Sequence, residues 1–325
     1  MKKIYRFLIK IPVIKNIISY YVHYSSKERR TCYGKENPDK TFYIIGQKER
    51  MGGLWWIVNK VIMHLAYADE KGFIPIIDYK HFWTQYHNPG ELNKVNVWEK
   101  FFMQPASYSL DDIKHSANII ISDKYPAPSS KYLMGNKEFY EDSARLEYFR
   151  KIFKKYVRFN STTYELLEKK RKEIVPDDTK VLGVLCRGTD YIIRKPKNHP
   201  VQPEPSTVVE MSQKVMKEKE CDYVFLATED EDILNLFKKT FGSKLLYVNQ
   251  RRVTKKQLDG QKYMVDVNKS VDGDKYQMGL DYLTSTYILS KCDCFIGGRT
   301  GGTKGVLLMR DKFEYEYIFD LGFYE

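Results

Sequence analysis

The second half of the chain repeats one pattern: a short apolar run, a polar or glycine-rich turn, and then a helix-like segment. Parallel strands need helical crossovers, so this alternation predicts a doubly wound α/β domain that begins near residue 176. Strands are expected at 181–186, 223–227, 244–248 and 294–296, and helices at 206–218, 232–240, 279–290 and 303–309.

The first half contains a similar unit built around a glycine pair. An apolar run at 41–45 leads to Gly52 and Gly53, and apolar residues then cover most of a helical surface over 55–69. A second apolar run follows at 74–77. Paired glycines permit a tight turn or a close backbone approach, so we expect a functional loop at the end of the first strand of a second parallel sheet.

The rest of the first half is less regular. Residues 79–128 are rich in aromatic side chains, Asn and Pro, with strands expected at 95–97 and 119–121. Residues 140–171 are rich in charged and large apolar side chains and favour one or two helices. We divide the chain into a basic segment (1–30), an N-terminal α/β domain (31–175) and a C-terminal α/β domain (176–325).

The chain is basic, with 54 Lys and Arg against 42 Asp and Glu, which favours an anionic partner. We find no zinc-finger spacing, RNA-binding aromatic motif or basic zipper, so nucleic acid is not an expected partner. In residues 1–30 cations interrupt every apolar run before a membrane span is reached. Residues 1–20 therefore fit either an amphipathic segment on an anionic membrane surface or a helix packed on its own domain.

Five cysteines form an odd set, and no secretory signal accompanies them. We therefore expect reduced thiols and a cytoplasmic setting. Neighbouring His or further Cys at ligand spacing are lacking around Cys292 and Cys294, so no metal and no cofactor is expected. The five are Cys32, Cys186, Cys221, Cys292 and Cys294.

The first candidate site follows the strand at 181–186. Arg187-Gly188-Thr189-Asp190 leaves the end of a buried strand, which is where open α/β sheets bind their ligands. A guanidinium can hold a diphosphate with two parallel hydrogen bonds. From the spacing alone, an Arg and Asp pair that only anchors the loop is an equally good interpretation.

Two further strand ends carry candidate groups. Thr228 and Glu229 follow the strand at 223–227, where they could face a ligand or only begin a helix. The turn 297–302 offers Gly298, Arg299, Thr300 and Gly301 at a helix start, where backbone N–H groups can bind phosphate. A tight structural turn explains these glycines equally well.

The order of these three motifs resembles that of the GDP-fucose transferases, the superfamily of the α-1,6-, nodulation and protein O-fucosyltransferases. The resemblance covers residues 178–310, and Gly52-Gly53 is similar more loosely to the amino-terminal glycine loop of the family. It implies two facing Rossmann-like domains of the GT-B type, with parallel sheets and helices on both faces. The donor would lie mainly on residues 176–325 and the acceptor on 31–175.

The resemblance also implies roles. Arg187 would hold the donor phosphates, Asp281 would read guanine, and the hydroxyl of Thr300 would lie near the phosphate. Donor binding is expected at Gly52, Gly53, Arg187, Thr228, Asp281, Gly298, Arg299, Thr300 and Gly301. Two positions depart from the family pattern, because Leu185 replaces its His and Gly188 replaces its second Arg.

Catalysis is assigned to Arg187, with Asp190, Glu204 and Glu229 as candidates for the base. Trp83, Tyr86 and His199 are weak candidates for contact with the acceptor, and each also fits a structural role. The expected function is an inverting, metal-independent transfer of fucose or a related sugar from a GDP-sugar to a glycan acceptor, either free or lipid-linked.

A cytoplasmic enzyme of bacterial surface polysaccharide synthesis (capsule or lipopolysaccharide), peripheral to the inner face of the plasma membrane, fits the basic amino terminus. Two alternatives stay open: the same fold using another nucleotide sugar, and a non-catalytic protein that binds a nucleotide or a glycan.

Overall fold

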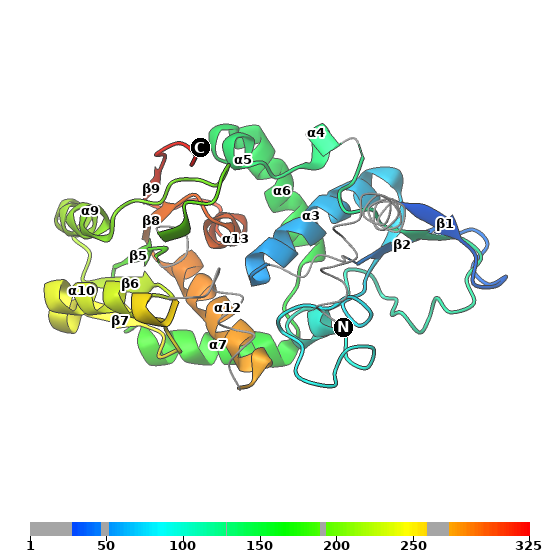
Figure 1. The fold of residues 1–325 in the computed structure, drawn as a ribbon, viewed down its shortest axis with the longest axis horizontal. Coiled ribbons are helices and arrows are strands. Elements are labelled where there is room, and N and C mark those ends of the chain that lie inside the picture. The colour runs from blue at the N-terminus through cyan, green and yellow to red at the C-terminus, as the bar shows by residue number, and fades with distance from the viewer. Residues whose placement is uncertain (1–27, 47–51, 128, 189–192, 259–272) are drawn as a thin grey trace, which may run out of the picture.

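The computed structural model describes residues 28–46, 52–127, 129–188, 193–258 and 273–325, and it contains two sheets in two lobes (Figure 1). The first sheet has the strand order β1-β4-β2-β3, and the second has the order β7-β6-β5-β8-β9. The strands are β1 (Arg29–Thr31), β2 (Phe42–Ile45), β3 (Ile74–Ile77), β4 (Ile119–Ile121), β5 (Val181–Leu185), β6 (Tyr223–Ala227), β7 (Leu245–Tyr247), β8 (Cys294–Gly298) and β9 (Tyr315–Phe319).

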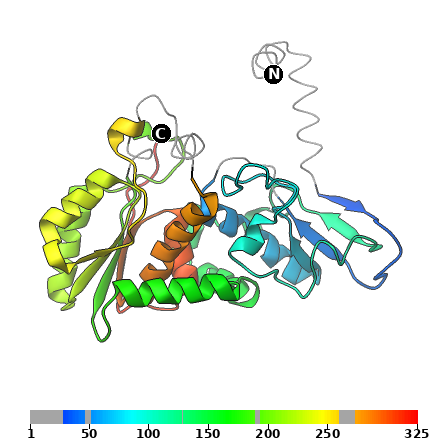
Figure 2. The ribbon, with the colours of Figure 1, turned by 90° about the horizontal axis from the view of Figure 1, so that it is seen from below.

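Helices cover and join the two sheets (Figures 1 and 2). They are α3 (Leu54–Lys71), α4 (Ser129–Tyr132), α5 (Asn136–Glu141), α6 (Ser143–Tyr156), α7 (Ser161–Ile174), α9 (Pro205–Glu218), α10 (Glu231–Phe241), α12 (Lys275–Lys291) and α13 (Gly301–Met309). Three short 3₁₀ segments, η1 (Val97–Lys100), η2 (Gly242–Lys244) and η3 (Lys255–Leu258), complete the described elements.

The second sheet confirms the predicted doubly wound domain. All four of its strand pairs are parallel, and each strand predicted between 181 and 296 lies within two residues of its expected bounds. The chain starts this sheet at its centre with β5, adds β6 and β7 on one side, and then adds β8 and β9 on the other. The strand order therefore reverses between β5 and β8, and such switch points are where open α/β sheets bind ligands.

The first sheet contains the predicted glycine unit. Strand β2 pairs in parallel with β3 and β4, and only β1 pairs antiparallel, with β4. Helix α3 is buried on nearly all sides, begins after Gly53, and ends at Gly72, whose φ of 67° is the left-handed conformation that glycine tolerates. The predicted helix at 55–69 is thus confirmed as an almost fully buried element at the centre of the molecule.

The strand predicted at 95–97 is wrong. The Asn96 side chain accepts a hydrogen bond from Tyr79 N (3.0 Å) and donates to Ile77 O (2.8 Å), so a side chain occupies the position that a neighbouring strand would take. The same side chain accepts from Trp98 N and begins η1. Two described strands, β1 and β9, lie outside the predicted set.

The two lobes share one hydrophobic core, which includes residues of α3, α6, α7, α12 and α13. Trp55 of α3 is fully buried and donates through Nε1 to the Thr286 hydroxyl of α12 (2.8 Å). Arg150 of α6 is also buried, and its guanidinium donates twice to Leu307 O of α13 (3.1 and 2.9 Å). These contacts fix the second lobe against the first.

All five cysteines are free; Cys32 is exposed and the other four are buried. The Cys221 and Cys294 sulfurs lie 4.0 Å apart. Across the part of the chain that the structure describes, no three His, Cys, Asp or Glu side chains gather as metal ligands would. No described helix combines the length and the apolar character that a membrane span requires. Residues 1–27 lie outside the described residues, so the interpretation of the basic segment stays a prediction.

Candidate functional site

The three strand ends of the predicted site lie side by side. Leu185, the last residue of β5, pairs with Ala227 of β6 on one side and with Gly297 of β8 on the other. Arg187, Thr228 and Thr300 follow these three residues within one to three positions. The motifs identified in the sequence therefore meet at the carboxyl edge of the sheet, at its switch point.

Arg187 forms an ion pair with Glu229 at this edge. Its Nε lies 3.2 Å from Glu229 Oε1, and the two side chains are 23% and 24% exposed. Arg187 also acts electrostatically on Tyr86 of the first lobe, where it opposes the rise that burial causes in the pKa of the Tyr86 hydroxyl. The guanidinium thus lies between the β6 strand end and the first lobe.

Gly188, the residue after Arg187, is tightly packed. A Cβ at this position would lie 2.5 Å from Ile233 Cδ1 and 2.7 Å from Asp230 Oδ2. Asp230 is fixed because its carboxylate begins α10 by accepting hydrogen bonds from Asp232 N and Ile233 N. Gly188 therefore packs against the start of α10 too closely for a side chain.

Thr228 and Asp230 serve mainly as helix-start residues. Thr228 is buried, and its hydroxyl accepts from Asp230 N at 3.2 Å. Its carbonyl oxygen accepts from Gln250 Nε2 at 3.3 Å. The local structure thus supports the capping interpretation of Thr228, while Glu229 is the residue of this turn whose carboxylate reaches Arg187.

Thr300 begins α13. Its hydroxyl accepts from Thr303 N at 3.1 Å, and its carbonyl accepts from the Tyr140 hydroxyl of α5 at 2.8 Å. Gly301 and Gly302 form the first turn of the helix, so their N–H groups belong to the helix terminus that favours anions. A Cβ at Gly298 would lie 2.3 Å from the buried Gln202 Oε1, which accounts for that glycine by close packing.

The Arg299 side chain is directed at two carboxylates. It is buried, and its Nη2 lies 2.8 Å from Asp320 and 3.1 Å from Glu141 of α5. Because a buried charge needs such partners, these contacts explain the residue without a ligand. Its predicted donor contact stays a prediction.

The glycine start of α3 meets the start of α13. The Asn59 side chain donates through Nδ2 to Gly301 O (3.3 Å), and a Cβ at Gly301 would lie 3.6 Å from Trp56 N in the first turn of α3. Figure 1 shows the end of α3 directed at α12 and α13 in the middle of the molecule. Two helix amino termini, one from each lobe, therefore converge beside the switch point.

Gly52 and Gly53 are held by the segment that contains the acceptor candidates. Gln85 Nε2 donates to Gly52 O (2.6 Å), and the Tyr86 hydroxyl accepts from Leu54 N (2.7 Å). Tyr86 is buried, so its described contact is with α3, whereas Trp83 is half-buried. The structure thus gives Tyr86 a structural role, and acceptor contact for both residues remains a prediction.

His199 is exposed and lies on a loop beside the chain's last residues, where its carbonyl accepts from Tyr324 N (2.9 Å). Asp190 lies outside the described residues. Glu204 is exposed and precedes α9. Among the candidate bases that the structure describes, Glu229 is thus the one in contact with Arg187.

Asp281 lies on the half of α12 that faces the same edge. Its Oδ1 accepts from Gln277 Nε2 at 2.6 Å. Burial raises the pKa of its carboxyl group, and Gln277, Lys170 and Arg252 oppose that rise. The ring of Tyr282, the next residue, lies 3.8 Å from a Cβ at Gly53, and its hydroxyl lies 2.8 Å from a Cβ at Gly302.

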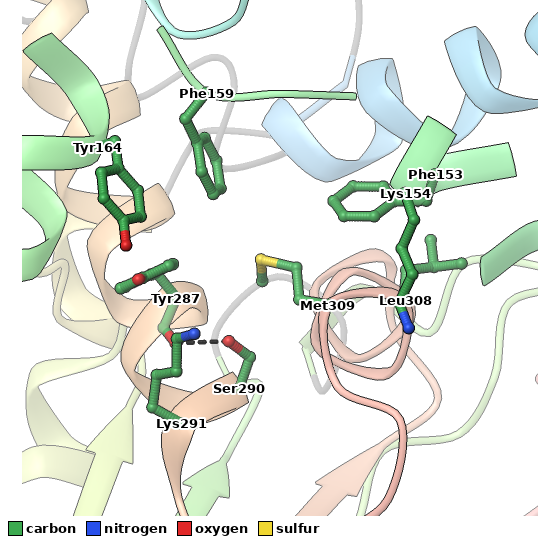
Figure 3. Close-up of a pocket in the computed structure, with 9 residues that line it drawn as sticks. All are labelled: Phe153, Lys154, Phe159, Tyr164, Tyr287, Ser290, Lys291, Leu308 and Met309. Atoms are coloured by element: carbon green, nitrogen blue, oxygen red, sulfur yellow. Dashed lines mark hydrogen bonds between the residues drawn. The ribbon is translucent and has the colours of Figure 1, made fainter. Parts of the chain in front are cut away.

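A separate cavity of about 190 Å³ lies at the other end of α12 and α13 (Figure 3). Ser290 is nine residues beyond Asp281, which is about 13 Å along a helix axis. The cavity is therefore distinct from the strand ends that carry Arg187. It is lined by Phe153, Lys154, Phe159, Tyr164, Tyr287, Ser290, Lys291, Leu308 and Met309.

Neither a family model nor a curated protein sequence matches the chain. Among solved structures it is similar to NodZ α-1,6-fucosyltransferase soaked with GDP-fucose, with a TM-score of 0.51 and 14% identity over 87% of this chain and 96% of that one. It is also similar to selenomethionine NodZ from Bradyrhizobium, with a TM-score of 0.49 and 14% identity over 87% of this chain and 95% of that one. A third similar structure is POFUT1 in complex with GDP-fucose, with a TM-score of 0.49 and 14% identity over 87% of this chain and 99% of that one.

The fold is therefore that of the GT-B-type glycosyltransferases, as predicted. More narrowly, it is the fold of the fucosyltransferase NodZ.

The sequence analysis missed three residues that border the site. Gln250 and Arg252 follow β7 in a polar stretch without periodicity, and Tyr282 stands beside Asp281 without a motif of its own. The adjacent Arg251-Arg252 pair was the one available signal, and charge alone could not separate it from an ordinary exposed surface.

Proposed function

We propose that the chain is a glycosyltransferase that moves a sugar from a nucleoside diphosphate sugar, with GDP-fucose as the first candidate, to a hydroxyl group of a glycan acceptor. The observation that carries this proposal is the in-register alignment of Leu185, Ala227 and Gly297, which gathers Arg187 and the α13 start at one switch point. The α3 start from the other lobe adds a second helix terminus that favours an anion.

In this proposal Arg187 and the N–H groups of Gly301 and Gly302 bind the diphosphate. The acceptor oxygen attacks the anomeric carbon, the bond from that carbon to the diphosphate oxygen breaks, and a carboxylate takes the hydroxyl proton. Attack opposite the leaving group inverts the anomeric configuration. Negative charge grows on the departing diphosphate, so Arg187 contributes roughly 3 kcal/mol of transition-state stabilisation, the loss seen when single preorganised donors are removed elsewhere.

Asp281 is proposed to read the base, because a carboxylate can accept two parallel hydrogen bonds from guanine N1 and N2. Glu229 is proposed as the base among the described candidates, because it contacts Arg187 at the strand ends. The similar NodZ structure was soaked with GDP-fucose, which supports testing this donor first.

The test is a thermal-shift comparison of GDP, UDP, CMP and ADP, each with and without Mg²⁺, on wild type, Arg187→Ala and Arg158→Ala. Arg158 is an exposed arginine that serves as the matched control. We expect stabilisation by GDP that is independent of Mg²⁺, lost in Arg187→Ala and kept in Arg158→Ala. Stabilisation by UDP instead would change the donor, and no response to any nucleotide would favour a glycan-binding protein.

Turnover is then measured as GDP release from GDP-fucose with glycan acceptors, and the product's anomeric configuration is read by NMR. A folded Arg187→Ala protein with full turnover would refute the role of Arg187. A lipid-linked acceptor on the cytoplasmic membrane face, as in surface polysaccharide synthesis, is proposed from the basic residues among positions 1–20. Unchanged partition onto anionic liposomes after removal of those residues would contradict that part.

A further inference from the structure

A network of hydrogen bonds joins Asp281 to the segment that follows β7. The Ser285 hydroxyl lies one helical turn after Asp281 and contacts both Asp281 O (3.1 Å) and Gln250 Oε1 (3.0 Å). Gln250 Nε2 in turn donates to Thr228 O at the end of β6 (3.3 Å). Residues 250–252 are thereby fixed between the strand ends and the face of α12 that carries Asp281.

Arg252 is held rigidly in this segment. Its Nη1 donates to Gln250 O (3.1 Å), its Nη2 donates to Val248 O (2.8 Å), and its guanidinium lies 5.3 Å from the centre of the Tyr247 ring. A guanidinium has five N–H groups. The two backbone contacts therefore orient the group and still leave one donor on each terminal nitrogen.

Arg252 and Asp281 interact without touching. Each side chain affects the pKa of the other: the guanidinium opposes the rise in the pKa of the Asp281 carboxyl, and the carboxylate opposes the fall that burial causes in the pKa of Arg252. Glu231 and Lys170 are the other charged groups that act on the pair. Among the described residues, no hydrogen bond or ion pair joins Arg252 to Asp281: Arg252 donates to Gln250 and Val248, and Asp281 accepts from Gln277.

The Asp281 carboxylate accepts hydrogen bonds, and the nearby Arg252 guanidinium donates them. Together they suit a ligand that has donors on one edge and acceptors on the adjacent edge. Guanine has this arrangement, with N–H groups at N1 and N2 and acceptors at O6 and N7. Adenine presents an amino group in place of O6, so it would place a donor against the guanidinium. Pyrimidines lack the second ring that carries N7.

We propose that Arg252 is a second base-reading residue, whose guanidinium donates to the O6 and N7 atoms of guanine while Asp281 accepts from N1 and N2. This inference rests on the proposed function, because it assigns the base that the same site selects. Gln250 and Ser285 act as positioning residues that keep the guanidinium in register with Asp281.

The experiment is isothermal titration of the whole protein with GDP, IDP and ADP, for wild type, Arg252→Gln, Arg252→Lys, Asp281→Asn and Arg251→Gln. IDP keeps O6, N7 and N1–H and lacks the N2 amino group. Arg251 is the exposed neighbour of Arg252 and serves as the matched control. Melting curves for each variant report whether the fold is intact.

Arg252→Gln should reduce the affinities for GDP and IDP by the same factor, about 5- to 150-fold, which is the range for one bidentate contact with a base edge. ADP binding should not change. Arg252→Lys keeps the charge without the planar arrangement of donors. Its melting temperature should therefore match that of wild type, but its preference for GDP should be lost. Asp281→Asn should reduce the preference for GDP over IDP, and Arg251→Gln should match wild type.

An unchanged ratio of GDP to ADP affinity in Arg252→Gln would overturn the inference. An equal loss of affinity for all three nucleotides in a folded variant would also overturn it, because it would indicate a contact with phosphate. If Arg187→Ala abolishes binding while Arg252→Gln leaves selectivity intact, the proposed function stands and this inference fails. If wild type binds no nucleoside diphosphate, both fail.

Discussion

The Nε atom of Arg187 lies 3.2 Å from the Glu229 carboxylate, at the junction of two neighbouring strand ends. The side chain proposed to hold a diphosphate is thus paired with an anion of the chain itself. A donor that binds there must exchange one anionic partner for another. In the proposed mechanism, this exchange would free Glu229 to accept a proton from the acceptor.

Glu229→Gln should separate these two roles. Removal of a half-buried ion pair changes the free energy by about 1 kcal/mol, so we expect GDP to bind about fivefold more tightly because its competitor is gone. Turnover should fall at the same time, because an amide cannot take the proton. Titration calorimetry and initial rates measure the two effects, and Asp232→Asn is the control for loss of a nearby charge. Tighter binding with unchanged turnover would leave Glu229 as a counterion only.

Gly188→Ala should destabilise the fold. The added methyl group would lie 2.5 Å from Ile233 Cδ1 and 2.7 Å from Asp230 Oδ2, and such overpacking typically costs about 1–3 kcal/mol. Urea unfolding gives the free-energy change. The double variant Gly188→Ala with Ile233→Val removes the Cδ1 atom and should recover part of the loss. Equal midpoints for wild type and Gly188→Ala would contradict the close packing described here.

Thr286→Val should weaken the junction of the lobes. The substitution keeps the side-chain shape but leaves the buried Trp55 Nε1 donor without its 2.8 Å partner, which costs about 1–3 kcal/mol. Thr284→Val is a close control, because within the described residues the buried Thr284 hydroxyl donates only to Leu280 O of its own helix. A Thr284→Val protein at least as destabilised as Thr286→Val would argue against the importance of the bond between the lobes.

Lys304 should make stability depend on pH. Burial lowers the pKa of its ammonium group to about 7, against the opposing effect of Glu138. Its Nζ donates to Met134 O (2.5 Å), and the group lies 5.4 Å from the centre of the Phe139 ring. In the unfolded chain the same group keeps its proton up to about pH 10. Between these values the unfolded state binds more protons, so the free energy of unfolding rises with pH, by at most about 1.4 kcal/mol per pH unit.

Lys304→Met should remove this rise. Urea unfolding of both proteins across the range from neutral to alkaline pH measures the difference, in which the titration of all other groups cancels. The free energy of unfolding of wild type relative to Lys304→Met should rise as the pH increases from 7 toward 10 and should be independent of pH below 7. Parallel curves for the two proteins would show that Lys304 has an ordinary pKa in the folded state.

Much of the second lobe could be predicted because its buried strands are continuous apolar runs that end in glycine or polar turns. The apolar runs at 181–185 and 223–227 are too short for helices and fit only buried strands. Their parallel pairing follows from the helix between them. The convergence of Arg187, Thr228 and Thr300 follows from the same reasoning. Helix α3 was predictable because its apolar residues lie on all sides and glycines stand at both ends.

Other features could not be predicted, because they depend on side chains that hydrogen-bond in place of backbone groups or on partners far apart in the sequence. Asn96 replaces a strand through its amide group, so the apolar residues around it suggested a strand that does not form. Arg299 looked like a phosphate ligand because Glu141 and Asp320 are distant in the chain. Arg252 went unnoticed because its position depends on hydrogen bonds to carbonyl groups, which any residue could provide.

The shared core also determines how this chain could be recombined with a relative. A chimera joined near residue 175 would keep α12 and α13, whose surfaces fit α3 and α6. These surfaces include the Thr286 hydroxyl, which accepts from Trp55, and the Leu307 carbonyl, which accepts from Arg150. Exchanging the second half without those matching helices would expose a large apolar surface to water. The smallest portable unit is therefore the second half together with α3 and α6.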